Sequence, residues 1–223
     1  MKTVLFVQGL GMTKHEWRGS FDEIAARLQS TGFNTVQFDL PIFDENGKCR
    51  ELPLTKRAKL VEEAAAKCRP DGVLAQSYGA TTALVASLPT VKTRLFISPA
   101  PNPKQNITNV YEEKGVKINY QGDTSLPRSS GENTTVGKEF WRDIENFDER
   151  KLAGNITSPV CILHGDRDTK ISALEINDFF KMITATKKKL KIYPGGDHGL
   201  VDIPRPLREE VLRDTVTWFK ETL

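Results

Sequence analysis

The chain has 223 residues, of which 38% are hydrophobic and 27% are charged, and its formal net charge is +3. This length and composition are typical of one soluble globular domain and argue against two full domains. The small positive excess indicates no nucleic-acid partner, and no apolar stretch approaches the roughly 20 residues that span a bilayer, so we expect neither nucleic-acid binding nor membrane insertion.

The predicted strands begin at the N-terminus. Thr3–Val7 is too short for the apolar core of a signal peptide and leads at once into a glycine turn, so we interpret it as a first strand. Later runs share its apolar or β-branched character on both faces, as expected of strands covered by helices. These runs are Thr35–Phe38, Gly72–Gln76, Arg94–Ile97, Val160–His164 and Lys189–Tyr193.

Helical patterns separate the strands. This alternation predicts an α/β fold, with a mostly parallel sheet of about six strands and helices on both faces. The first helix carries an apolar stripe from Trp17 to Leu28 and is closed by Gly32. Ser172 and Glu175 form a capping box that begins a later helix. The other predicted helices are Thr55–Cys68, Ala80–Leu88 and about Pro206–Leu223.

One segment, about residues 99–158, is too long for a simple crossover between two strands. Val116–Tyr120 alternates like a strand, Thr134–Val136 could pair with it, and Lys138–Phe147 has a helical pattern. Long excursions of this kind are usually lids or binding loops. We therefore predict a single domain, residues 1–223, with a small cap inserted over the C-terminal edge of the sheet.

Ser77 lies where a predicted strand gives way to a helix, in the sequence Ala75-Gln76-Ser77-Tyr78-Gly79. A serine on such a sharp turn presents its hydroxyl above the sheet, and small neighbours let the strand and the helix pass close together. Ser77 is therefore a candidate nucleophile. The pattern also recurs by chance, and the alternative is a serine that only caps the following helix.

A glycine turn, Gln8-Gly9-Leu10-Gly11, follows the first predicted strand. A turn of this kind can direct the backbone N–H of Leu10 at a substrate carbonyl. The N–H of Tyr78, at the start of a helix, is a second candidate donor. Together these donors predict an oxyanion hole.

A base for Ser77 has to be sought among three histidines. His198 lies in the glycine-rich loop Pro194–Gly199 between the last strand and the last helix, which suits an imidazole that must reach a serine on another loop. His15 begins a helix and His164 ends a strand, and both are common structural positions. We therefore take His198 as the candidate base.

An acidic partner for His198 is expected in the loop after the penultimate strand, where Asp166 and Asp168 both lie. Asp168 is the better candidate because it lies further past the strand end, whereas we expect Asp166 to bond backbone amides of its own turn. One alternative is that both aspartates only form turns. Another is a metal site of His164, Asp166 and Asp168, but no fourth ligand lies nearby, so we predict no metal.

The order Ser77, Asp168, His198, together with the Gln8–Gly11 turn, resembles the α/β-hydrolase family, in particular its small serine esterases and acyl hydrolases with a short cap. The resemblance covers nearly the whole chain and begins at what would be the family's third strand, so the leading hairpin is missing. Gln8 stands where the family often has histidine. Ala75 stands where it usually has glycine.

The resemblance implies hydrolysis of a carboxylic ester, thioester or amide of a small molecule through an acyl-enzyme on Ser77, with no cofactor. Acyl transfer to an acceptor other than water stays open. Tyr120, Phe140 and Trp141 in the predicted cap are candidates for lining an acyl pocket. The alternative is that they form the cap's own small core.

Two other classes of protein are considered. Gly9-Leu10-Gly11 after a strand superficially matches a dinucleotide-binding motif, but Lys14 stands where the third glycine belongs. A non-catalytic binding protein of the same fold is the second alternative, because fold does not determine function.

The cysteines bear on localisation. Cys49, Cys68 and Cys161 are odd in number and widely spaced, which suits neither a disulfide framework nor a zinc site. We therefore expect free thiols in a reducing cytoplasm.

Overall fold

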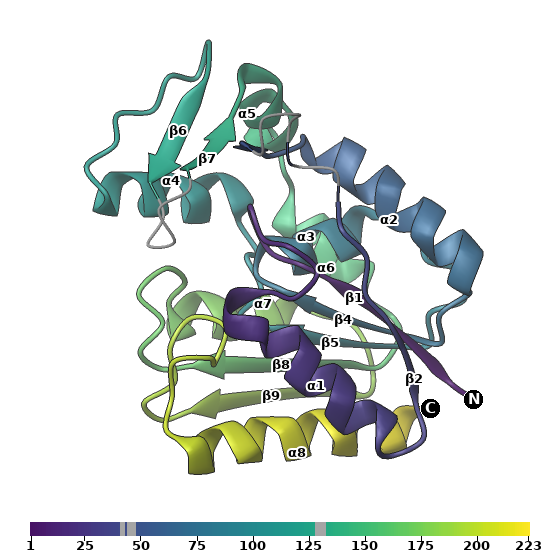
Figure 1. Cartoon of the computed structure of the whole chain (residues 1–223). Coiled ribbons are helices and arrows are strands. Elements are labelled where there is room, and N and C mark those ends of the chain that lie inside the picture. The colour runs from purple at the N-terminus through teal and green to yellow at the C-terminus, as the bar shows by residue number, and fades with distance from the viewer. Residues whose placement is uncertain (41–42, 44–47, 128–132) are drawn as a thin grey trace.

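The computed structural model describes residues 1–40, 43, 48–127 and 133–223. Its centre is a six-stranded sheet in which every neighbouring pair of strands is parallel (Figure 1). All six predicted strands are confirmed, with ends that differ by at most two residues. In spatial order they are β2 (Asn34–Val36), β1 (Thr3–Val7), β4 (Gly72–Gln76), β5 (Thr93–Ile97), β8 (Val160–Gly165) and β9 (Lys188–Tyr193).

Helices cover both faces of this sheet, as predicted. Alternate residues of a strand point to opposite faces, so Phe6 of β1 packs with one group of helices and its neighbour Leu5 with the other. The first face is covered by α1 (Ser20–Gln29) and α8 (Arg205–Thr222) (Figure 1). The second is covered by α2 (Leu54–Cys68), α3 (Tyr78–Val85), α6 (Glu149–Gly154) and α7 (Ala173–Met182).

Two helices begin two or more residues away from their predicted first residue. Trp17 lies in a short 3₁₀ turn, η1 (Trp17–Gly19), and α1 begins only at Ser20 because Gly19 has a left-handed φ of 70°. Trp17 is half-buried and donates its indole N–H to Asp202 at 2.9 Å. α3 begins at Tyr78, two residues earlier than predicted, because the helix starts directly after the turn at Ser77. It ends at Val85, three residues earlier than the predicted Leu88, because Ala86 is already extended.

A small second sheet lies outside the main one. Its order is β3, β7, β6, with β3 parallel and β6 antiparallel to β7. One of its strands comes from outside the predicted cap segment 99–158, so two separate parts of the chain build it. Residues 128–132 of that segment lie outside the described residues. The strands are β3 (Cys49–Arg50), β6 (Thr124–Pro127) and β7 (Asn133–Val136).

The prediction of a strand at Val116–Tyr120 is wrong. These residues belong to no strand, and the partner of Thr134–Val136 is β6 instead. Val116 and Ile118 are half-buried against an apolar cluster without joining a ladder. Their alternation therefore reflects burial on one side, which does not require a strand partner.

Two helices pack with the small sheet at one end of the molecule, at the upper left of Figure 1. α5 (Lys138–Glu145) confirms the helical pattern predicted for Lys138–Phe147, apart from its last two residues. α4 (Pro103–Glu113) was not predicted, although Asn102 caps it by accepting the N–H of Gln105 at 3.2 Å and Pro103 occupies its first turn. Among the described residues, no helix combines the length and apolar character that crossing a membrane requires.

Candidate active site

Ser77 sits in a strained turn between β4 and α3. Its φ is 52° and its ψ is −125°, a conformation that non-glycine residues rarely adopt. The side chain makes no capping hydrogen bond to α3, so the capping alternative is excluded. Ser77 is half-buried and directly follows the carboxyl end of β4.

Gly79 shows why the turn needs small residues. A Cβ atom added there would lie 2.2 Å from the carbonyl oxygen of Val7 and 2.5 Å from that of Gln8. The close approach is therefore between the first turn of α3 and the end of β1, the neighbour of β4 in the sheet. This packing brings the Gln8–Gly11 loop directly against Ser77.

The three predicted triad side chains lie in one hydrogen-bonded line. The Nε2 atom of His198 is 3.1 Å from the Oγ of Ser77, and its Nδ1 atom is 2.8 Å from Oδ2 of Asp168. A carboxylate only accepts hydrogen bonds, so the proton of a neutral His198 lies on Nδ1 and Nε2 presents a lone pair to the serine hydroxyl. The imidazole is thus oriented to accept the Ser77 proton.

Asp168 is held as a carboxylate. Its side chain is buried, and Oδ1 accepts the backbone N–H groups of Lys170 at 2.9 Å and Ile171 at 3.1 Å. Burial alone would raise the pKa of Asp168, but the hydrogen bond from His198 and the charges of His198 and His164 outweigh it, so the pKa lies below its ordinary value. Asp168 therefore keeps its negative charge beside His198.

Asp166 has a different partner from the predicted one. Its Oδ1 atom accepts the N–H of Gly195 at 2.7 Å, in the loop that carries His198, whereas Asp168 bonds the amides of its own turn. The two aspartates thus hold the β8 and β9 loops together. His164 contacts the carbonyl of Ile171 through Nε2 at 3.0 Å. Its Nδ1 atom lies 3.7 Å from Oδ2 of Asp168, whereas Asp166 bonds another loop. Among the described residues, no three histidine, cysteine, aspartate or glutamate side chains are grouped so that they could hold a metal ion.

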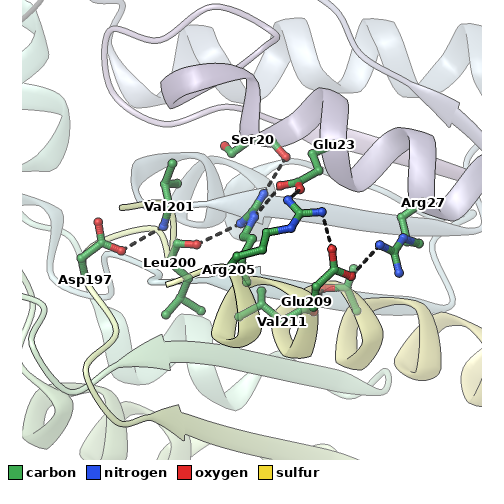
Figure 2. A network of polar contacts seen from close by, with 11 residues as sticks. Ser20, Glu23, Arg27, Asp197, Leu200, Val201, Arg205, Glu209 and Val211 are labelled. Atoms are coloured by element: carbon green, nitrogen blue, oxygen red, sulfur yellow. Dashed lines mark hydrogen bonds and ion pairs between the residues drawn. The ribbon is translucent and has the colours of Figure 1, made fainter. Parts of the chain in front are cut away.

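The His198 loop is fixed at several points (Figure 2). Asp197 accepts the N–H of Val201 at 2.9 Å and that of Asp202 at 3.0 Å. The buried Arg208 of α8 donates to the carbonyl of Leu200 at 2.9 Å and reaches Ser20 of α1 at 3.1 Å. The histidine loop is therefore tied to both helices on its face of the sheet.

Ion pairs extend this network along α1 and α8. Glu23 accepts from Arg205 at 2.5 Å and from Arg208 at 2.6 Å, and Glu209 accepts from Arg27 at 2.7 Å (Figure 2). Most of these side chains are partly exposed, so each pair contributes little to stability by itself. Their effect is to connect the two helices that anchor the loop.

The Gln8–Gly11 loop carries the first predicted oxyanion donor, Leu10. A Cβ atom at Gly9 would lie 3.5 Å from Cβ of Ser77, so the loop is adjacent to the candidate nucleophile. The N–H of Gly9 is bonded to the carboxylate of Glu16, and that of Gly11 to the carboxylate of Glu51 at 2.6 Å. Two carboxylates at this loop would repel a phosphate, which argues against the dinucleotide-binding alternative.

The second predicted donor, Tyr78, is the first residue of α3, so its N–H has no carbonyl one turn earlier in the helix to bond. Its ring is buried in an apolar cluster against which Leu10 also packs, and the ring centre lies 5.0 Å from the guanidinium carbon of Arg57. Sequence reasoning missed Arg57. Its spacing from Leu54, Ala58 and Val61, all buried on α2, is the signal that could have found it.

Phe140 and Trp141 are buried in the apolar cluster of the small sheet and its helices, and the ring of Phe140 lies 5.6 Å from that of Tyr78. Tyr120 is 43% exposed and packs its ring edge against Trp141. This packing favours the alternative that they form the cap's own core. Their role in substrate binding stays a prediction.

One protein-family model matches part of the chain. It is described as Serine aminopeptidase, S33, and it matches residues 135–202, a stretch that includes Asp168 and His198. No curated protein matches the sequence.

Solved structures match almost the whole chain at low identity. Est1E from Butyrivibrio proteoclasticus has a TM-score of 0.76 at 17% identity, covering 99% of this chain and 88% of that one. Alpha/beta hydrolase domain-containing protein 10 from mouse has a TM-score of 0.76 at 16% identity, covering 98% and 90%. The monoacylglycerol lipase of Paleococcus ferrophilus has a TM-score of 0.72 at 17% identity, covering 97% and 94%. These likenesses show a shared fold.

Proposed function

We propose that this chain belongs to the α/β-hydrolase family and is a serine hydrolase that cleaves a carboxylic ester, thioester or amide of a small molecule through an acyl-enzyme on Ser77. The observation that supports the proposal most is the hydrogen-bonded line from Ser77 through His198 to Asp168, at 3.1 Å and 2.8 Å. The strained φ of Ser77 supports it as well, because such strain persists where a function needs it.

In the first half of the reaction, Nε2 of His198 takes the Ser77 proton as the hydroxyl oxygen attacks the acyl carbonyl carbon. The negative charge that develops on the carbonyl oxygen is stabilised by the N–H groups of Leu10 and Tyr78. The ionised Asp168 stabilises the imidazolium. His198 then donates the proton to the leaving alcohol, thiol or amine, and the carbonyl re-forms as an ester of Ser77.

In the second half, a water molecule replaces the leaving group. His198 accepts a proton from the water as its oxygen attacks the acyl carbon, and then returns a proton to Ser77 as the acyl–serine bond breaks. The products are a carboxylic acid and the free enzyme.

A fluorophosphonate probe tests the nucleophile. We expect labelling of the wild-type chain at Ser77, none in Ser77→Ala, and slow labelling in His198→Ala. Ser87→Ala is the matched control, since Ser87 is exposed, lies two residues past the end of α3 and is outside the triad. A wild-type chain that folds but is not labelled would support a non-catalytic binding protein instead.

A hydrolysis panel tests the substrate class. It contains p-nitrophenyl esters of graded acyl chain length, one thioester and one aminoacyl amide. The amide is informative because the matching family model describes serine aminopeptidases, and the esters are informative because a structural neighbour is a monoacylglycerol lipase. Turnover of at least one class that disappears in Ser77→Ala is the expected result.

We also propose a reducing cytoplasm as the location. Cys49, Cys68 and Cys161 are free thiols, and burial raises the pKa of Cys161 to about 12, so that this thiol is unreactive. Cell fractionation tests this proposal, and recovery of the protein from an oxidising compartment would contradict it.

A further inference from the structure

A buried ion pair lies beneath the loop that carries Leu10. Arg57 of α2 is 0% exposed, the side chain of Glu51 is also fully buried, and Nη1 of Arg57 is 2.7 Å from Oε1 of Glu51. Removing two charges from water is costly, so a buried pair contributes little net stability compared with apolar side chains. The role of this pair therefore depends on the backbone groups that Arg57 and Glu51 hold in place.

Arg57 contacts both parts of the predicted oxyanion hole. Its Nη2 atom donates to the carbonyl of Gln8 at 2.5 Å and to that of Gly9 at 3.4 Å, which anchors the loop after β1. Its Nε atom donates to the hydroxyl of Thr82 at 3.2 Å, and this hydroxyl donates to the carbonyl of Tyr78 at 2.9 Å. The side chain of Arg57 thus joins the Gln8–Gly11 loop to the first turn of α3.

Glu51 holds the same loop from its other side. Its Oε2 atom accepts the N–H of Gly11 at 2.6 Å, and its Oε1 atom accepts from Arg57 and from the N–H of Leu52 at 2.9 Å. The N–H of Gly9 is bonded to Glu16. Charged side chains therefore bond the backbone on both sides of Leu10.

These contacts determine the direction of the Leu10 N–H. The carbonyl of Gly9 and the N–H of Leu10 belong to one planar peptide, and the chain has no cis peptide bond among the described residues. In a trans peptide the oxygen and the hydrogen point in opposite directions. Because Arg57 contacts the carbonyl oxygen of Gly9, the N–H of Leu10 is directed away from Arg57.

We infer that Arg57 and Glu51 are positioning residues that orient the two oxyanion donors, Leu10 and Tyr78. The inference rests on the proposed serine-hydrolase function. It assigns the pair a role in stabilising the transition state and none in binding the substrate. Misplacing a donor lowers kcat, while KM depends on contacts elsewhere.

The test compares an ester with its thionoester, in which sulfur replaces the carbonyl oxygen. Sulfur accepts hydrogen bonds weakly, so a misplaced donor costs the thionoester less. We expect Glu51→Gln to lower kcat for the ester by about 10- to 100-fold with little change in KM, and to lower the ester-to-thionoester ratio of kcat/KM. Arg57→Lys, which keeps the charge but loses the forked contacts, should do the same if Glu51→Gln does not fold.

Asp214→Asn is the matched control. Asp214 is a partly buried carboxylate that accepts hydrogen bonds from Lys191 and from the Tyr193 hydroxyl. None of these residues belongs to the Gln8–Gly11 loop. The ester-to-thionoester ratio of Asp214→Asn should equal that of the wild type. If the probe labels the wild type at Ser77 but Glu51→Gln and Arg57→Lys both keep the wild-type ester-to-thionoester ratio, this inference alone is overturned. An unlabelled wild type would overturn the proposed function.

Discussion

The hydroxyl of Ser98 accepts a hydrogen bond from the backbone N–H of Gly199 at 3.1 Å, across 101 positions of sequence. Ser98 directly follows β5, is fully buried and has a φ of 44°. Gly199 follows His198 directly. The end of a central strand thereby sets the position of the proposed catalytic base.

We predict that Ser98→Ala weakens both stability and turnover. The buried N–H of Gly199 loses its acceptor, which costs about 1–3 kcal/mol of unfolding free energy. The released loop should misplace His198 and lower kcat by about tenfold. Urea unfolding and ester kinetics measure the two effects. Ser87→Ala, at an exposed serine, is the control and should change neither.

Asp168→Asn should lower kcat strongly, whereas the free energy of unfolding should change little. An amide at this position can present an N–H to Nδ1 of His198, which favours the wrong tautomer, and a loss of about 10⁴-fold is typical of such a change. Asp166→Asn is the control, because Asp166 contacts only the Gly195 amide in the described structure and should cost less than about tenfold. Equal losses in the two variants would contradict the assignment of Asp168.

Gly79→Ala should destabilise the chain strongly. The new Cβ atom would meet the carbonyl oxygens of Val7 and Gln8, which are backbone atoms and cannot rotate away. We expect a loss of about 3 kcal/mol or failure to fold. Gly154→Ala, where a Cβ atom has nothing within 4 Å, should be neutral or slightly stabilising. Thermal unfolding of both variants checks this difference.

His164 should make stability depend on pH. Burial lowers the pKa of His164 below its ordinary value of 6.5, although the nearby Asp168 opposes the shift. Below pH 6.5 the unfolded chain binds a proton at this residue that the folded chain does not, so stability falls as pH falls through this window.

His164→Gln removes this titration while keeping a donor for the carbonyl of Ile171. The unfolding free energy of this variant, measured in urea between roughly pH 5 and 8, should fall less steeply below pH 6.5 than that of the wild type. Identical slopes would show that His164 does not contribute. The lowered pKa of Asp168 acts in the same direction but at lower pH, since its ordinary value is 3.8.

Local patterns in the sequence were enough to predict the main sheet, most helices around it and the residues proposed for the triad. The six strands are marked by short apolar runs, and Ser77 and His198 by the glycines beside them. These signals are local because strand formation, helix termination and tight turns depend on a few neighbouring residues. The alternation of Val116–Tyr120 misled, because burial on one side of an extended segment gives the same pattern as a strand.

Only the tertiary structure decided which distant groups meet. The sequence places Arg57 on a helix and Glu51 before it. It does not show that the two side chains are 0% exposed or that they contact the Gln8–Gly11 loop. It likewise does not show that Asp166 bonds Gly195, that β3 joins β7, or that Ser98 holds Gly199. Such contacts depend on how separate elements pack, and packing is determined by the whole chain and not by any one segment.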